Sequence, residues 1–240
     1  MGRMTNPPHP KLDELIAVLA RLRAPGGCAW DREQTHESLV RHLVEETYEL
    51  VEAIESGERD ELVEELGDVL YQVIFHADIG AHREIDPFDL DDVAASMTAK
   101  MVGRHPHVFG DTTAETAADV IAVWDDLKAV EKPGRTSVLD GIPQAMPALL
   151  LAEKLLGRAE RVGVSVPGPA VPPGPAVPPD LAVPPGPAGP DDERELGRQL
   201  LGIVADARLS GLDAERALRA ALRDLQHDIR RAEGTGLITE

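Results

Sequence analysis

A proline-rich segment at residues 167–190 is the strongest constraint on how this 240-residue chain folds. It holds 11 of the 20 prolines and repeats Ala-Val-Pro-Pro-Gly-Pro at 170–175 and 182–187. Proline fixes φ and removes an amide donor, so this segment cannot form a helix or a central strand. We expect a polyproline-like linker or a disordered loop, and a spacer is favoured over a docking motif for a proline-binding partner.

The sequence on both sides of this segment follows helical periodicity. Apolar residues recur at spacings of three and four, as at Leu12, Leu15 and Leu19, with almost no strand-like alternation. Asp31 and Gln34 resemble a capping box for the second helix. The predicted helices cover about 12–22, from the capping box at Asp31 to Ser56, 59–80, 89–103, 113–131 and 145–162, and two more follow the linker. The pattern predicts an all-α protein, built as an antiparallel helical bundle.

The composition excludes several classes of protein. With 43 acidic against 24 basic residues the net charge is −19, which argues against a nucleic-acid or anionic-membrane partner. The single cysteine, Cys28, excludes an internal disulfide framework and fits a reducing compartment. The N-terminus lacks an apolar signal core, and no apolar run approaches the ~20 residues of a membrane helix. We therefore expect a cytoplasmic protein.

Two glutamates occupy positions where helices normally carry apolar residues. Glu46 lies three residues after Leu43 and four before Leu50, inside the apolar stripe of its helix. Glu65 has the same relation to the apolar residues of the following helix. An isolated buried charge is costly, so each carboxylate needs a partner.

The short turn at Gly57 predicts how these two helices pair. They should pack antiparallel, with Glu49 and Glu65 each eight residues from Gly57 and Glu46 and Asp68 each eleven residues from it. Each helix then presents an i, i+3 pair of acids on one face. Helix axes about 8–10 Å apart allow the four carboxyl groups to converge.

Four converging carboxylates cannot all stay ionised without a cation. Oxygen-only ligands favour Mg²⁺ or Mn²⁺. A di-iron site is disfavoured because neither Glu46 nor Glu65 has a histidine three residues further on. A solvated acidic surface remains the alternative; it accounts for the other acids of these helices, but not for Glu46. Those other acids are Glu52, Glu55, Glu58 and Glu61.

The order of these motifs resembles the MazG family of nucleoside triphosphate pyrophosphohydrolases. The resemblance covers about residues 11–165. It rests on Glu45-Glu46-x-x-Glu49, Glu65-x-x-Asp68, Gly27-Cys28-Ala29-Trp30-Asp31, Arg104-His105-Pro106-His107-Val108-Phe109 and Trp124-x-x-x-Lys128. It implies a MazG-type helical fold, assembly at least to dimers, Mg²⁺ dependence, and hydrolysis of NTPs or dNTPs to monophosphate and pyrophosphate.

The resemblance also implies roles for individual residues. The metal ligands would be Glu46, Glu49, Glu65 and Asp68. Glu45 would assist catalysis beside Glu46, either as a base that positions water or as a ligand of a second metal ion. Lys100, Arg104 and Lys128 would contact phosphates, and Trp124 the nucleotide. Without the resemblance, the three basic residues would read as surface charge and Trp124 as core.

Two further motifs are read as structural. His105-Pro106-His107 lacks a nearby cysteine and predicts a helix end that packs Phe109, not a zinc site. Cys28 and Trp30 are read as packing that shapes the mouth of the pocket.

The C-terminal part resembles a decayed second copy of the module. Glu195-Leu196-Gly197 repeats the sequence of Glu65-Leu66-Gly67, but Arg198 stands where the first copy has aspartate. A cation at a ligand position opposes metal binding. The predicted organisation is a flexible N-terminus (1–10), a catalytic domain (11–165), the linker (166–190) and a non-catalytic MazG-like segment (191–240).

The function favoured by these observations is Mg²⁺- or Mn²⁺-dependent hydrolysis of nucleoside triphosphates, which clears nucleotides from the pool. A narrower all-α pyrophosphohydrolase for dUTP/dCTP or phosphoribosyl-ATP stays open as an alternative. So does a helical scaffold or regulator without turnover. The decayed C-terminal part favours the scaffold, and the intact acids of the N-terminal part disfavour it.

Overall fold

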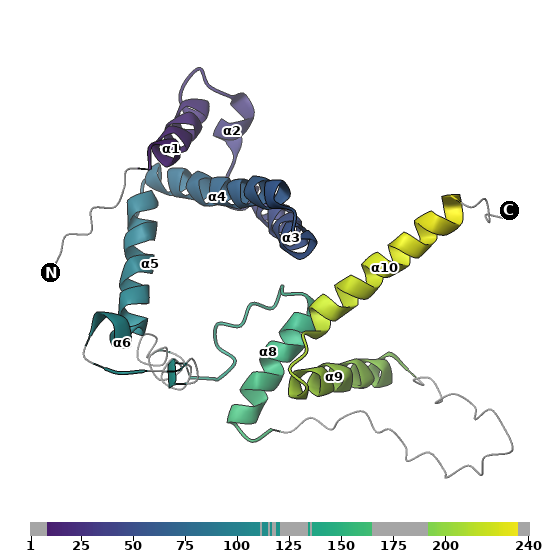
Figure 1. The fold of residues 1–240 in the computed structure, drawn as a ribbon. Coiled ribbons are helices and arrows are strands. Elements are labelled where there is room, and N and C mark those ends of the chain that lie inside the picture. The colour runs from purple at the N-terminus through teal and green to yellow at the C-terminus, as the bar shows by residue number, and fades with distance from the viewer. Residues whose placement is uncertain are drawn as a thin grey trace, which may run out of the picture. The chain divides into compact units, whose positions relative to one another are not determined.

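The computed structural model describes residues 9–110, 136–164 and 192–234, together with 112–114, 116, 119, 120 and 134. Every regular element in these ranges is an α-helix, which confirms the all-α prediction. The chain divides into two compact units, residues 1–131 and 132–240. In the first unit lie α1 (Pro10–Arg23), α2 (Ala29–Glu33), α3 (Val40–Ser56), α4 (Arg59–Ala81), α5 (Leu90–Arg104) and α6 (Pro106–Phe109), and in the second α8 (Ala148–Arg161), α9 (Glu193–Leu209) and α10 (Ala214–Gly234) (Figure 1).

Some predicted features lie outside the described residues. They are the proline-rich linker, most of the helix predicted at 113–131 with Trp124 and Lys128, and nearly all of the N-terminal segment 1–10. Elsewhere the predicted helices are present with ends close to those expected, except that the helix expected to begin at Asp31 begins at Val40. No helix among the described residues is long and apolar enough to cross a membrane.

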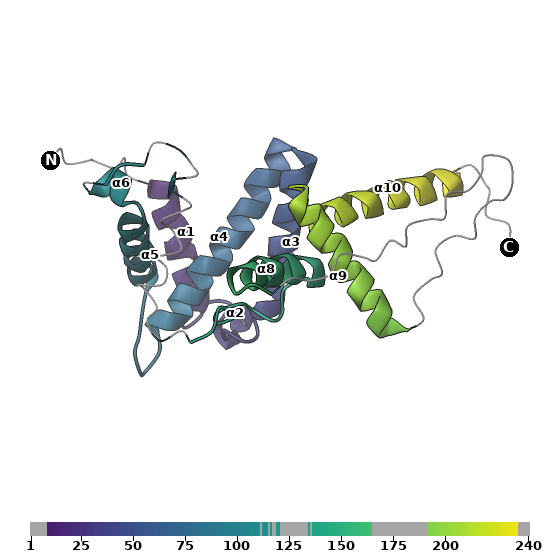
Figure 2. The ribbon, with the colours of Figure 1, turned by 90° about the horizontal axis from the view of Figure 1, so that it is seen from below.

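The first unit is organised around the α3–α4 hairpin, which Figures 1 and 2 show as two helices side by side. Gly57 ends α3 in the left-handed conformation, with φ at 78°, and its N–H donates to the carbonyl of Ala53. A residue with a β-carbon disfavours this conformation, so glycine suits the turn. Because the chain reverses within two residues, residues of α3 and α4 that are equally far from Gly57 in sequence face each other.

A small apolar core joins α1 to the C-terminal half of α4. Leu19, Leu39, Ile74 and Phe75 are buried in contact with one another, and further apolar residues pack around them. Arg23 lies over the ring of Phe75, at 5.1 Å from its centroid, and its Nε donates to Asp78 at 2.6 Å. This end of the hairpin is therefore fixed by both apolar and ionic contacts.

The predicted capping box at Asp31 is wrong. Asp31 lies within α2, is buried, and its carbonyl accepts from Arg23 Nη1 at 2.5 Å. Helix α3 instead begins at Val40 after Leu39, with no side-chain cap. Asp31 stands inside a separate short helix that ends at Glu33, and Gln34 donates to the carbonyl of Trp30 instead of forming a box with Asp31.

Helix α5 starts from a capping box that the structure does contain. Asp89 accepts from the backbone N–H of Asp92 at 3.0 Å, and Asp92 accepts from that of Asp89 at 3.1 Å. Gly80 permits the connection to pass close to α4, because a β-carbon there would lie 2.6 Å from the ring of Phe88. Figures 1 and 2 show α5 beside the C-terminal end of α4, away from α3.

The second unit consists of α8, α9 and α10. Leu156 on α8 and Val204 on α9 are buried, and Arg208 donates to Glu160 at 3.0 and 3.2 Å across the two helices. We expected the N-terminal domain to extend to residue 165, yet α8 makes its helix contacts with α9 and α10. Helix α10 keeps a row of half-exposed apolar residues: Leu218, Leu222, Leu225 and Ile229.

Candidate metal centre

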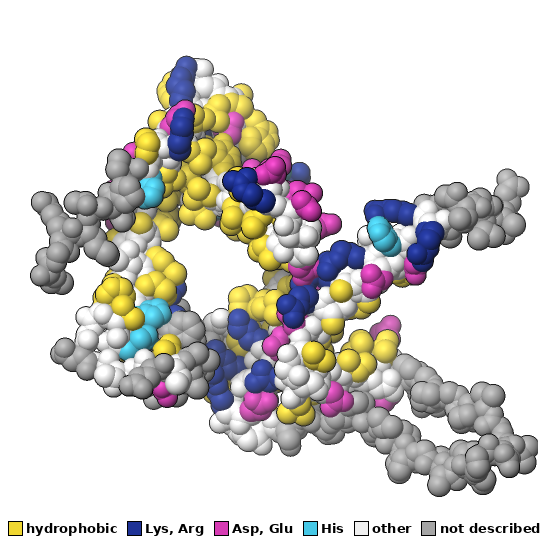
Figure 3. All heavy atoms as spheres, in the orientation of Figure 1, with side chains coloured by type: hydrophobic (Ala, Val, Ile, Leu, Met, Phe, Trp, Pro, Cys, Tyr) yellow, Lys and Arg dark blue, Asp and Glu magenta, His cyan; other side chains and the backbone are white. Residues whose placement is uncertain are grey.

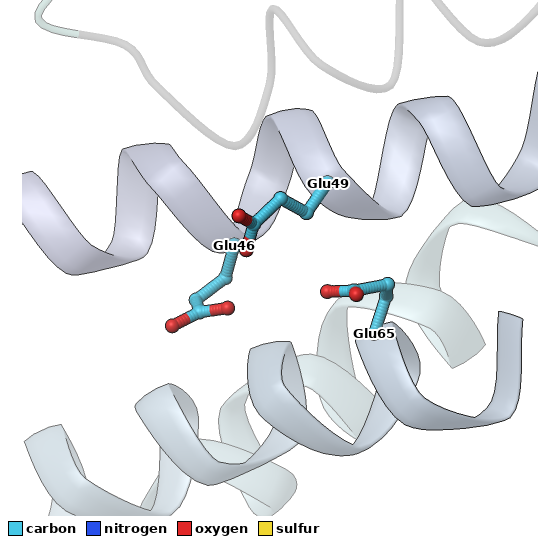
Figure 4. Close-up of side chains that lie close together, drawn as sticks. All are labelled: Glu46, Glu49 and Glu65. Atoms are coloured by element: carbon cyan, nitrogen blue, oxygen red, sulfur yellow. The ribbon is translucent and has the colours of Figure 1, made fainter. Parts of the chain in front are cut away.

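Three of the predicted ligands come together between α3 and α4. Glu46 and Glu49 project from one helix and Glu65 from the other (Figure 4). One carboxylate oxygen from each of them lies within 4.8 Å of the others. Glu46 and Glu65 are partly buried, whereas Glu49 is exposed, so the cluster opens to solvent on one side.

Asp68 borders this group without being part of it. It is absent from the three oxygens that meet, but its charge acts on both Glu46 and Glu65. The largest charge effect on the pKa of Glu46 comes from Asp68, and the largest charge effect on the pKa of Glu65 comes from Glu49. These are the two pairs that equal distance from Gly57 predicts.

The electrostatics of the cluster disfavour full ionisation. Desolvation raises the pKa of Glu46, with further contributions from the charge of Asp68 and a shared hydrogen bond with Glu49. Desolvation also raises the pKa of Glu65, followed by the charges of Glu49 and Asp68. Glu65 Oε2 is shielded from solvent and has no hydrogen-bond partner among the described residues.

These features fit a divalent cation. Within the described part of the chain, none of the four carboxylates forms an ion pair with a basic side chain. The donor set consists only of oxygen, which suits hard cations such as Mg²⁺ and Mn²⁺. A cation would neutralise the repulsion and give the orphaned oxygen of Glu65 a partner.

Glu45 lies beside the cluster on α3. Its side chain is exposed, and its Oε2 is 3.4 Å from Nδ1 of His42, one turn earlier. The ring of His42 in turn meets the indole of Trp30 edge to face, with centroids 5.8 Å apart. His42 was not among the predicted site residues, although its spacing of three and four residues from Glu45 and Glu46 places it on their face of α3.

The predicted phosphate-binding residues of α5 do not reach the cluster within one chain. Lys100 is exposed and lines a shallow groove of about 440 Å³ along α5, and α5 makes no helix contact with α3. That groove contains none of the clustered acids; its other lining residues are Phe88, Asp92, Val93, Ser96 and Met97. Arg104 is partly buried in the last turn of the same helix.

The two motifs read as structural give a mixed result. Helix α5 ends at Arg104 as predicted, and His105 Nδ1 lies 2.6 Å from the carbonyl of Met101. Phe109, however, is 61 % exposed, so the prediction that it packs is wrong. Cys28 is a free, partly buried thiol that precedes α2, and Trp30 is 51 % exposed.

Comparison with known proteins identifies the class of enzyme to which this helical fold and its acidic cluster belong, the nucleotide pyrophosphohydrolases. Residues 34–109 match the model of the MazG nucleotide pyrophosphohydrolase domain. The chain is 39 % identical to the nucleoside triphosphate pyrophosphohydrolase/pyrophosphatase MazG of Thermotoga maritima, over 92 % of this chain and 85 % of that one.

Two further relatives align over similar lengths. A nucleoside triphosphate pyrophosphohydrolase of Escherichia coli K12 is 36 % identical over 93 % of this chain and 87 % of its own. An uncharacterised 26.1 kDa protein of Streptomyces cacaoi is 46 % identical over 95 % of this chain and 84 % of its own. The chain belongs to the MazG nucleotide pyrophosphohydrolase family.

Proposed function

We propose that this protein hydrolyses nucleoside triphosphates, both NTPs and dNTPs, to nucleoside monophosphate and pyrophosphate. The observation that carries the proposal is the oxygen-only cluster of Glu46, Glu49 and Glu65 on the α3–α4 hairpin. The names of the Thermotoga and Escherichia relatives support the same reaction. The proposed role of this protein is to clear nucleotides from the pool in the cytoplasm.

The proposed metal is Mg²⁺ or Mn²⁺, held by Glu46, Glu49, Glu65 and Asp68. When bound, such a cation withdraws charge from phosphate oxygens and makes phosphorus more open to attack. Glu45 is exposed beside the cluster and is the proposed base that orients the attacking water and accepts its proton. Water attack breaks the α–β phosphoanhydride bond, and pyrophosphate leaves.

Substrate phosphates need cations, and we propose Lys100, Arg104 and Lys128 for this role, with Trp124 as a contact for the nucleotide. Helix α5 does not contact α3 within one chain, so α5 of a second chain is the proposed source of Lys100 and Arg104. The high negative charge of the chain excludes a long polyanion such as DNA, but not a small triphosphate that enters with its metal ion.

A homo-oligomer, at least a dimer, is therefore part of the proposal. The hairpin leaves apolar side chains 40–51 % exposed at helical spacing, and burying them against a second copy would remove them from water. They are Val44 and Tyr48 on α3 and Leu66, Leu70 and Val73 on α4. Figure 3 shows how hydrophobic side chains gather over this unit. Leu70→Glu is expected to shift the oligomer toward monomer in analytical ultracentrifugation; an unchanged mass would contradict this interface.

We propose that the C-terminal segment 191–240 is a non-catalytic, MazG-like remnant. At its repeat of the ligand motif, Arg198 binds Glu195 on the same helix. This ion pair leaves no acid of that motif available for a cation. If the protein were a scaffold or regulator without turnover, the N-terminal part would be non-catalytic as well.

The direct test is pyrophosphate release in the presence of Mg²⁺. Wild type is compared with Glu46→Gln and Asp68→Asn, which keep side-chain size but remove charge, and with Glu195→Gln as the matched control. We expect the first two to lose at least about 100-fold in turnover and the control to lose nothing. Equal rates for all four proteins would contradict the assignment.

A panel of nucleotides separates the remaining candidates. Activity across several NTPs and dNTPs supports the broad reaction. Activity confined to dUTP/dCTP or to phosphoribosyl-ATP would favour the narrower enzyme. No turnover by a folded, metal-loaded wild type would favour the scaffold.

A further inference from the structure

Trp30 is a large aromatic side chain in an unusual setting. Its side chain is 51 % exposed, and its described ring contact is with His42. An edge-to-face contact, with planes at 76°, occupies at most one face of the indole. Because half of the side chain is exposed, the indole has surface available to a planar ligand.

The indole of Trp30 contacts the same face of α3 that carries the acidic cluster. His42 is four residues before Glu46 and seven before Glu49, so the three share one face of α3. Neighbouring side chains on a helix face are ~5–6 Å apart, and the rings of Trp30 and His42 are 5.8 Å apart. Trp30 is therefore separated from Glu46 by one side chain, that of His42, and lies within reach of the base of a nucleotide whose phosphates are bound at the acids.

The position of Trp30 is fixed by the fold. Gly27 lies so close to α1 that a β-carbon would collide with the carbonyl oxygens of Arg21 and Leu22, which brings α2 back against the unit. Arg23 then holds Asp31 by its carbonyl and is itself held by Asp78. Gln34 Nε2 donates to the carbonyl of Trp30 at 2.9 Å. The ring thus stands on a preorganised support, which lowers the entropic cost of binding.

We propose that Trp30 is a stacking platform for the nucleobase of the substrate, with His42 as the residue that positions it. This inference rests on the proposed function, since it assigns the base end of the same site. Every nucleobase has an aromatic face, so stacking provides affinity with little discrimination among bases. The platform therefore suits a broad substrate range, and it adds to the nucleotide contact proposed for Trp124.

The test separates base binding from phosphate binding. Binding of α,β-methylene-ATP and of inorganic tripolyphosphate, each with Mg²⁺, is measured by calorimetry for wild type, Trp30→Ala and Trp30→Phe. We expect Trp30→Ala to weaken binding of the nucleotide analogue by about 5- to 150-fold and to leave the affinity for tripolyphosphate unchanged. Trp30→Phe keeps an aromatic face and is expected to retain most of the affinity.

His42→Gln provides the test of positioning, with His227→Gln as its control because His227 is an exposed histidine on α10, which carries none of the residues of the proposed site. His42→Gln is expected to weaken binding of the analogue by a smaller factor than Trp30→Ala, and His227→Gln to change nothing. Equal weakening of analogue and tripolyphosphate, no weakening by Trp30→Ala, or a changed oligomeric mass of Trp30→Ala would overturn the proposal. Pyrophosphate release by the wild type, measured on the same samples, tests the proposed function separately.

Discussion

Helices α4 and α9 carry the same three residues in sequence, Glu-Leu-Gly, and give them opposite electrostatics. On α4, desolvation and the neighbouring acids Glu49 and Asp68 raise the pKa of Glu65. On α9, hydrogen bonds from Arg198 and then Gln199 lower the pKa of Glu195. Two differences explain these opposite pKa shifts. One is the residue three positions after the glutamate, and the other is whether a facing helix brings further acids. On α9, Arg198 already neutralises Glu195, so this carboxylate does not require a metal ion.

The largest expected effect comes from making α4 resemble α9. Asp68→Arg would place a guanidinium three residues after Glu65, where it can pair with that carboxylate as Arg198 pairs with Glu195. We expect turnover to fall by at least about 100-fold in a pyrophosphate-release assay, while circular dichroism stays helical. Glu84→Arg makes the same change of charge in an exposed connection and should stay active. An active Asp68→Arg protein would show that an arginine at this position does not prevent catalysis.

The second prediction concerns pH, because the two glutamates should affect stability with opposite signs. Glu65 has a raised pKa in the fold, so its charge destabilises the fold above its ordinary pKa, and this penalty disappears as the pH falls. Glu195 has a lowered pKa, so its contribution is stabilising above its ordinary pKa and is lost as the pH falls through its folded value.

Melting temperatures without metal check this. At pH 7, Glu65→Gln should melt above wild type and Glu195→Gln slightly below it. Both differences should shrink toward pH 4. If Glu65→Gln melts below wild type at pH 7, the carboxylate is stabilised by a partner that the comparison does not include.

The smallest expected effect comes from making α9 resemble α4. Arg198→Asp exchanges an exposed attraction for a repulsion between Glu195 and Asp at position 198, so we expect a small fall in melting temperature. No catalytic site should appear, because α9 packs with α8, where Glu160 is bound to Arg208. Pyrophosphate release by the double variant Asp68→Arg, Arg198→Asp checks this. Restored turnover would show that a single substitution makes the C-terminal copy catalytic.

The paired acids could be predicted from sequence because every step is local. Gly57 fixes a two-residue reversal, helical periodicity places Glu46 and Glu65 in apolar stripes, and counting from the turn pairs them. The role of Asp31 could not be predicted in this way. Arg23 bonds to Asp31 and to Asp78, which is 55 residues away from Arg23, and no local pattern reveals such a contact.

The exposure of Trp30 and the partners of α8 also depend on tertiary packing. A tryptophan in a glycine-rich loop is equally compatible with a core and with a binding surface until α2 is placed. Helix α8 shows ordinary helical periodicity, which indicates an apolar face but not which helices cover it. Its contacts with α9 and α10 bridge the proline-rich segment in sequence, where local reasoning places a boundary.

We propose that the acids of α3 and α4, and not those of α9, bind a divalent cation. Electron paramagnetic resonance of Mn²⁺ tests it directly, since the signal of free Mn²⁺ falls as the ion binds. We predict that wild type and Glu195→Gln bind Mn²⁺ alike and that Asp68→Arg does not. Equal binding by Asp68→Arg, or loss of binding by Glu195→Gln, would show that the cation is not held by the acids of α3 and α4.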